Sequence, residues 1–259
     1  MKTSKTTDLL VYLLFAGILV MFGILFFVFF KTGHFELQQE RLSLKPDVKR
    51  VVIVSNASMV EIHKAQEDSP YLLYDRQVAD NTKDEIKVEQ SDGAVTLTIN
   101  RQKSNRITNM GASSAKVALY LPQNSSVEVS LKLDLLKLSV KDASFGSLSV
   151  DSRLFLLSAE QCKIRHLSLK GNVGSADLKG ALCDTVTAKL NVGNLTVEGL
   201  DPDQGMELKS RINLGRVDTG LPMDFGTWGI VVNDQATRAC GQAAAKYDLD
   251  INLANVALK

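Results

Sequence analysis

The feature that most constrains the fold is a repeat of about 20 residues in the middle of the chain. Apolar residues recur there at successive steps of 21, 19, 19 and 22 residues. The residues that we align in this way are Leu133, Leu154, Val173, Val192 and Leu214. Apolar residues also stand three positions later, at Leu136, Leu157, Ala176, Leu195 and Val217. Helix-pair repeats need about 33 residues or more, so each unit has room only for short strands and corners.

One such unit cannot bury its own apolar face, but units stacked about 4.8 Å apart share a continuous core and pair their strands. We therefore predict an all-β fold, a β-solenoid (β-helix) with rungs of about 20 residues. A leucine-rich repeat is the alternative of similar length. Its helical back is not indicated here, because the chain lacks helical periodicity between the strands.

The corners of three successive units share a pattern of asparagine, an apolar residue and glycine. The three copies are Asn172-Val173-Gly174, Asn191-Val192-Gly193 and Asn213-Leu214-Gly215. We expect the glycines to adopt positive φ at a corner. The asparagines are expected to bond the corner backbone or to stack as a ladder. Asp134 and Phe155 take the glycine's place in the two preceding units, which are therefore less typical.

The N-terminal part contains a run of 22 residues without a charge, Leu9–Phe30. As a helix it would span about 33 Å, which matches a hydrocarbon core of about 30 Å. A signal peptide is the alternative, but its apolar region is about 7–15 residues and ends in small residues. We expect an uncleaved transmembrane helix, with residues 1–8 as a short cytoplasmic tail and 31–49 as a linker. Residues 50–259 would form the solenoid outside the cytoplasm.

The segments on either side of the repeat alternate apolar and polar residues, as half-buried strands do. Asp92-Gly93 indicates a hairpin turn or tight corner, and 101–114 is expected to be a polar loop. Strands within 228–259 are expected to close the end of the stack, because an open end exposes strand edges.

The composition excludes several classes of site. The net charge is +1, which does not suggest a nucleic-acid-binding protein. The chain has three cysteines, no CxxC pair and three widely separated histidines, so we expect no metal site. Cys162 and Cys183 lie 21 residues apart, about one repeat. We expect buried thiols, and a disulfide between them stays open because it depends on Cα separation.

No motif of nucleophilic, metal or nucleotide chemistry is present, so we expect no catalytic residue and no cofactor. A polysaccharide-active enzyme is the main rival, and it would need clustered acids on one face. The candidate binding residues are instead basic: Lys170, Lys189 and Arg211 each stand three positions before an aligned apolar residue. If stacked, they form a basic column for an anionic partner. The alternative is a solvated face of scattered charges.

Four features together resemble the "putative adhesin" families of unknown function from bacterial envelopes, including the head-GIN domain. They are the strand Val51–Ile53, the turn and strand Asp92–Ile99, the strand Val117–Pro122 and the glycine-containing rungs. The resemblance covers residues 48–259 and implies a right-handed β-solenoid that is exported and often tethered to a membrane. From the residues we expect a binding or scaffold role in the envelope, with an envelope protein or an anionic polymer as partner, and envelope-stress signalling is the alternative.

Overall fold

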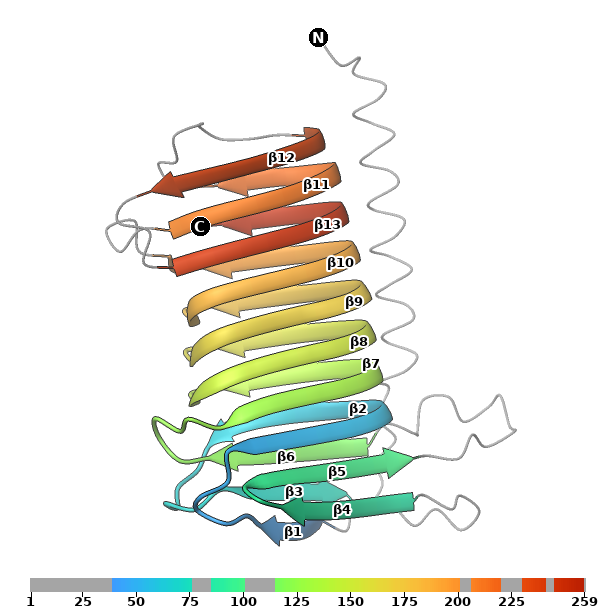
Figure 1. Ribbon diagram of the computed structural model, residues 1–259, viewed down its shortest axis with the longest axis vertical. Coiled ribbons are helices and arrows are strands. Elements are labelled where there is room, and N and C mark those ends of the chain that lie inside the picture. The colour runs from blue at the N-terminus through green and yellow to red at the C-terminus, as the bar shows by residue number, and fades with distance from the viewer. Residues whose placement is uncertain are drawn as a thin grey trace, which may run out of the picture.

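The computed structural model describes residues 39–75, 85–100, 115–200, 206–219, 230–240 and 245–258, and all of its regular elements are strands (Figure 1). The strands are β1 (Gln39–Ser43), β2 (Arg50–Lys64), β3 (Tyr71–Asp75), β4 (Glu85–Ser91), β5 (Ala94–Asn100), β6 (Ala115–Leu121), β7 (Glu128–Lys141), β8 (Ser144–Glu160), β9 (Lys163–Lys179), β10 (Leu182–Glu198), β11 (Met206–Thr219), β12 (Ile230–Cys240) and β13 (Ala245–Leu258).

The predicted transmembrane run Leu9–Phe30 lies outside the described residues. Within the described ranges, the chain has no helix that is long and apolar enough to cross a membrane.

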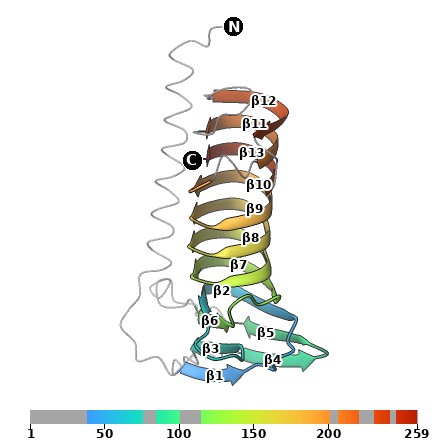
Figure 2. The ribbon, with the colours of Figure 1, turned by 90° about the vertical axis from the view of Figure 1, so that its left-hand side faces the viewer.

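The predicted stack of rungs is confirmed in the middle of the chain. Strands β7 to β10 pair in parallel, and the partner of each residue lies 19 positions further along, as for Leu138, Leu157 and Ala176. Each long strand runs along one side of the stack, curves, and returns on the other side (Figure 1). Viewed from the side, the rungs are narrow loops in a single column (Figure 2).

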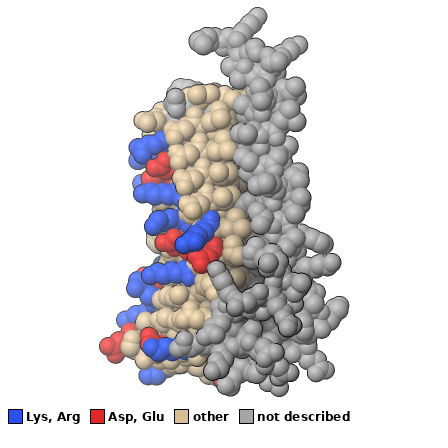
Figure 3. Space-filling model, turned by 90° about the vertical axis from the view of Figure 1, so that its right-hand side faces the viewer, with Lys and Arg blue, Asp and Glu red and all other residues tan. Residues whose placement is uncertain are grey.

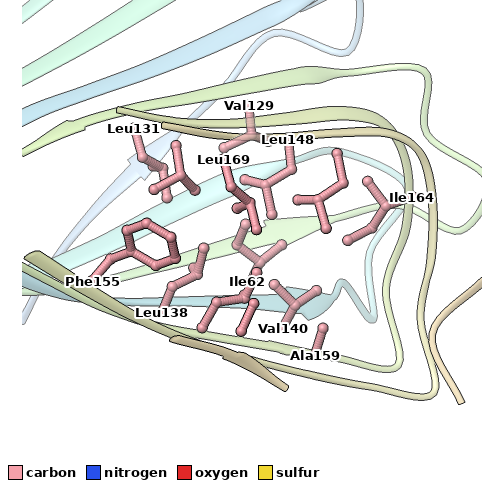
Figure 4. Close-up of a cluster of buried hydrophobic side chains, with 14 of the residues drawn as sticks. Ile62, Val129, Leu131, Leu138, Val140, Leu148, Phe155, Ala159, Ile164 and Leu169 are labelled. Atoms are coloured by element: carbon pink, nitrogen blue, oxygen red, sulfur yellow. The ribbon is translucent and has the colours of Figure 1, made fainter. Parts of the chain in front are cut away.

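The core lies between the two sides of this column. Alternate residues of each strand point inward, so aliphatic side chains from both sides meet in layers (Figure 4). The predicted inward residues Leu136, Leu157 and Leu195 are at most 3% exposed, which confirms their place in the core. The side chain of Val217, which was also predicted to point inward, lies outside the described part of the structure.

The first unit of the sequence alignment is wrong by two residues. Leu135, not Leu133, pairs with Leu154, and Leu133 pairs with Ser152. Leu136 pairs with Phe155 and so belongs to the glycine column. The step here is 19 residues like the others, and the predicted 21 arose because β7 offers several leucines that fit an apolar pattern equally well.

Apart from the misaligned Leu133, which is buried, the aligned apolar residues are partly exposed rather than core residues, as at Leu154, Val173 and Val192. Two consecutive residues point outward where each long strand curves, a polar residue (asparagine in β9, β10, β11 and β13) and the apolar residue after it. The alternation of inward and outward side chains changes phase at this bend, so a fixed period of two cannot be carried through it.

The corner glycines have a different role from the one predicted. Among the described residues, the glycines with positive φ are Gly93, Gly180 and Gly199, so Gly174, Gly193 and Gly215 do not need left-handed backbone. Left-handed conformations occur at the opposite, tight corner, and they recur every 19 residues. The residues at this corner are Asp142, Gln161, Gly180 and Gly199.

The three glycines face the core where a side chain would meet a neighbour, although Leu136, Phe155 and Ala254 occupy the same column on other rungs. A Cβ on Gly174 would lie 2.2 Å from Cζ of Phe155, whose ring occupies the space between neighbouring rungs. A Cβ on Gly193 would lie 2.7 Å from Leu190 Cδ1, and one on Gly215 would lie 2.4 Å from the Ala254 carbonyl oxygen. Close packing therefore explains these three glycines.

The C-terminal end does not follow the order of the chain. Strand β13 lies between β10 and β11 and is parallel to both, whereas β12 forms the outer antiparallel edge (Figure 1). The prediction that these strands simply close the stack is therefore wrong for β13. The chain skips one rung after β10, and the longer connection 199–205 accounts for the 22-residue step.

At the N-terminal end, one rung is divided between two strands. The first half of β2 pairs with β5 and its second half with β6, while β4 and β3 pair antiparallel to β5 and β6. Strand β1 pairs with β3, and Leu44 and Val48 are buried in the core. The described fold therefore begins before residue 50, within the segment expected to be a linker. Asp92-Gly93 forms the predicted hairpin turn between β4 and β5, and 101–114 lies outside the described residues.

Candidate functional site

The four asparagines at the bends form one hydrogen-bonded ladder. The Asn191 amide donates to Asn172 Oδ1 at 3.1 Å, Asn252 donates to Asn191 at 3.0 Å, and Asn213 donates to Asn252 at 2.7 Å. The predicted ladder is thereby confirmed, with Asn252 of β13 as a member that the alignment missed. Asn191, Asn213 and Asn252 each donate one N–H within the ladder, whereas Asn172 only accepts, so every amide keeps at least one N–H as a donor for a ligand.

A shallow groove of about 390 Å³ runs beside this ladder. Its floor contains Ser152, Gly171 and Leu190, and a Cβ on Gly171 would lie 2.2 Å from the Ser152 carbonyl oxygen. Lys170 and Lys189 precede the floor residues in the chain, whereas the asparagines follow them, so the two groups line opposite sides. A Cβ on Gly171 would also lie 3.3 Å from Cε1 of the buried Phe155 ring, so there is no room for a side chain at Gly171.

The predicted basic column is only partly correct. Lys170 and Lys189 face each other on neighbouring rungs. Arg211 occupies the same position on β11, but Asp250 of β13 stands between it and Lys189. Arg211 Nη1 lies 3.3 Å from Asp250 Oδ2, so its charge is paired within the column.

Other charges in register alternate in sign. In the same column, Lys132, Asp151 and Lys170 alternate before Lys189 is reached, and a second column consists of Lys141, Glu160, Lys179 and Glu198. In the second column, the pKa of Lys179 is raised, first by its hydrogen bond to Asp177 and then by the charges of Asp177, Glu198 and Glu160. Among all cross-strand partners in the described strands, Lys170 and Lys189 are the one pair of like formal charge.

These two lysines differ in their own partners. Lys170 Nζ lies 3.5 Å from Asp151 Oδ2, but both side chains are more than half exposed, so this ion pair is weak. The side chain of Lys189 has no hydrogen bond or ion pair within the described part of the chain. Like charges directly opposite on neighbouring strands are destabilising, and an anion bound between them would remove that repulsion.

The Cys240 side chain lies outside the described part of the structure, and the other two cysteines do not form a site. Cys162 and Cys183 are buried free thiols. Burial raises the pKa of Cys162 to about 11, and burial followed by the neighbouring Cys162 raises that of Cys183 to about 12. Such thiols are poor nucleophiles and metal ligands. The described ranges contain no group of three or more His, Cys, Asp or Glu residues that could hold a metal ion.

Charged side chains gather in a band along one side of the stack, beside a strip with few charges (Figure 3). This surface lies on stacked, in-register rungs, each of which has one tight corner and one wide bend. The family profile described as "Toastrack DUF4097" matches residues 48–216. The chain belongs to the toastrack family.

Solved structures similar to this toastrack protein share little sequence with it. A putative cell adhesion protein from Clostridium sporogenes has 14% identity and a TM-score of 0.38, and the match covers 86% of this chain and 100% of that one. A putative adhesin from Bacteroides fragilis has 10% identity and a TM-score of 0.41, with 88% and 99% covered. A putative lipid binding protein from Parabacteroides distasonis has 12% identity and a TM-score of 0.26, with 88% and 98% covered. No curated protein matches the chain.

Proposed function

We propose that this toastrack protein is a right-handed β-solenoid held by Leu9–Phe30 on the outer side of a bacterial cell membrane, where it binds an anionic polymer of the envelope. The uncharged run of 22 residues supports the anchor. Long domains that follow such a helix translocate largely regardless of their charge, which supports the outward orientation.

The observation that carries the binding role is the stacked pair Lys170 and Lys189. Elsewhere the registered charges are arranged to attract one another, and here two lysines stand opposite each other on strands about 4.8 Å apart. The amides of Asn172 and Asn191 line the same groove on the opposite side. Ammonium groups attract carboxylates or phosphates, and the amide N–H groups donate hydrogen bonds to oxygen atoms between them.

The groove favours binding over turnover. It is shallow, its lysines are exposed, and its acids, Asp151 and Asp250, are each paired with a cation. A repeated row of weak contacts suits a linear polymer, because successive units of the polymer engage successive rungs and their contributions combine.

We expect the double variant Lys170→Ala/Lys189→Ala to bind polygalacturonate at least about 10-fold more weakly than wild type, a loss of about 1.4 kcal/mol. Arg211→Ala should change the affinity less than about twofold, because its charge is already paired with Asp250. The measurement is isothermal titration of the full chain in detergent, at 0.1 M and 1 M salt. Wild-type binding should weaken as the Debye length falls from about 10 Å to about 3 Å.

Lys137→Ala is the matched control, because Lys137 is an exposed lysine on the other outer side of the stack. Neutral dextran and phosphatidylglycerol vesicles separate a glycan from a lipid headgroup. Equal affinities of wild type and the double variant, or a larger loss with Lys137→Ala, would remove the groove from consideration.

A further inference from the structure

The position of β13 has a consequence for how copies of this protein interact. Strands β10 and β11 are not paired with each other, and β13 fills the space between them. Twelve residues of β13 pair with β10 and thirteen with β11. Without this strand, both neighbours would expose a row of unpaired backbone N–H and C=O groups.

The space is also lined by the core. On β13, Tyr247, Leu249 and Ile251 face one side of the stack, and each is at most 2% exposed. Val256 and Leu258 complete the other side and are fully buried. The space between β10 and β11 therefore fits a strand with bulky residues at alternate positions. It also places Asn252 in register with the asparagine ladder.

The chain connection to β13 is short. Met206, the first residue of β11, pairs with Cys240 at the end of β12 and with Ala245 at the start of β13. Strand β12 therefore ends on one side of Met206, and β13 begins on the other side. Residues 241–244 alone link these two strands. A strand on a short hinge can be exchanged between two copies, because the exchanged element regains all its contacts in the second copy.

We propose that the space between β10 and β11 is a strand-acceptor site whose partner is a second copy of this chain. Residues 245–258 of each copy enter the acceptor site of the other, so two solenoids are joined by reciprocal exchange of β13. The strand contacts of the exchanged β13 are those that it makes within one chain. This proposal does not depend on the ligand of the groove.

Disulfide trapping between differently tagged copies tests the exchange. Thr187 on β10 faces Asp248 on β13 in register, and both side chains point outward. Facing Cα atoms at the strand spacing lie within disulfide range. Full-length Thr187→Cys and Asp248→Cys, each in a Cys240→Ser background and with N-terminal tags of different size, are co-expressed and oxidised. We expect a disulfide-linked product that carries both tags.

The matched control is the pair Ser168→Cys and Thr187→Cys, which face each other across β9 and β10. These strands are consecutive rungs joined by a tight corner, so the control pair should give no product between copies. The single-chain double variant Thr187→Cys/Asp248→Cys should close within one chain or between two. Closure only within one chain, equal inter-copy yields from both pairs, or no closure at all would each overturn the proposal.

Discussion

Replacing Leu195 by aspartate is expected to lower the free energy of unfolding by about 3–5 kcal/mol. Leu195 is 1% exposed and lies in the core between Ala176 and Val256 of the neighbouring rungs. A carboxylate at this position has no cation or N–H donor to pair with, because the backbone groups around it are used by the strand ladders. Denaturant unfolding followed by circular dichroism measures the loss.

Thr185→Asp is the control on the same strand. Thr185 faces His166 and Lys246 on the outer surface, so an added carboxylate there is solvated and lies beside a cation. Its unfolding midpoint should stay close to that of wild type. A Leu195→Asp protein that unfolds with the midpoint of Thr185→Asp would show that this column faces solvent and that the inward register is wrong.

Ending the chain after residue 244 is expected to release β11 and β12 from the stack while leaving the rungs up to β10 folded. The deletion removes β13, and with it every strand pairing that joins β11 to the rest of the described fold. Stability in stacked repeats is largely a sum of nearest-neighbour terms, so rungs three or four positions away should be little affected. Hydrogen exchange with mass spectrometry reports each segment separately.

In this variant, amides of 206–240 should exchange within the shortest labelling time, while those of β8 should keep the protection of wild type. A full-length variant with Asp248→Ser serves as control, since Asp248 is an exposed residue of β13. Retention of wild-type protection in 206–240 after the deletion would contradict the place of β13 between β10 and β11.

Much of the stack could be predicted from sequence, because its spacing is a local property. A corner and a strand of fixed length set the 19-residue interval between Gly174 and Gly193. They also set the apolar residues two and four positions after each glycine. The phase change at the bend could not be found in this way. It depends on how the strand curves around the core, which places Val173 outward although its neighbours suggest an inward position.

The candidate binding groove was also only partly predictable from the sequence. Lys170 and Lys189 lie on consecutive rungs, and their stacking was predictable from a step of 19 residues. The separation of Arg211 from Lys189 was not, since it depends on a strand that comes last in the chain and sits two places from the end of the sheet path. A signal was present, however: Asp250-Ile-Asn252-Leu repeats the pattern of Arg211-Ile-Asn213-Leu and identifies β13 as a further rung.

Thiol labelling of Lys189→Cys tests the central proposal most directly. It reports whether the groove lies outside the cytoplasm on a membrane-anchored protein. The background is Cys240→Ser, and Cys162 and Cys183 are buried thiols with raised pKa values that react slowly. A membrane-impermeant maleimide is added to intact or lysed spheroplasts, and label is read in membranes washed with alkaline carbonate. We predict labelling of Lys189→Cys before lysis and of a Thr3→Cys control only after lysis. The reverse pattern, or loss of the Lys189→Cys protein from the washed membranes, would contradict the anchored, outward-facing solenoid.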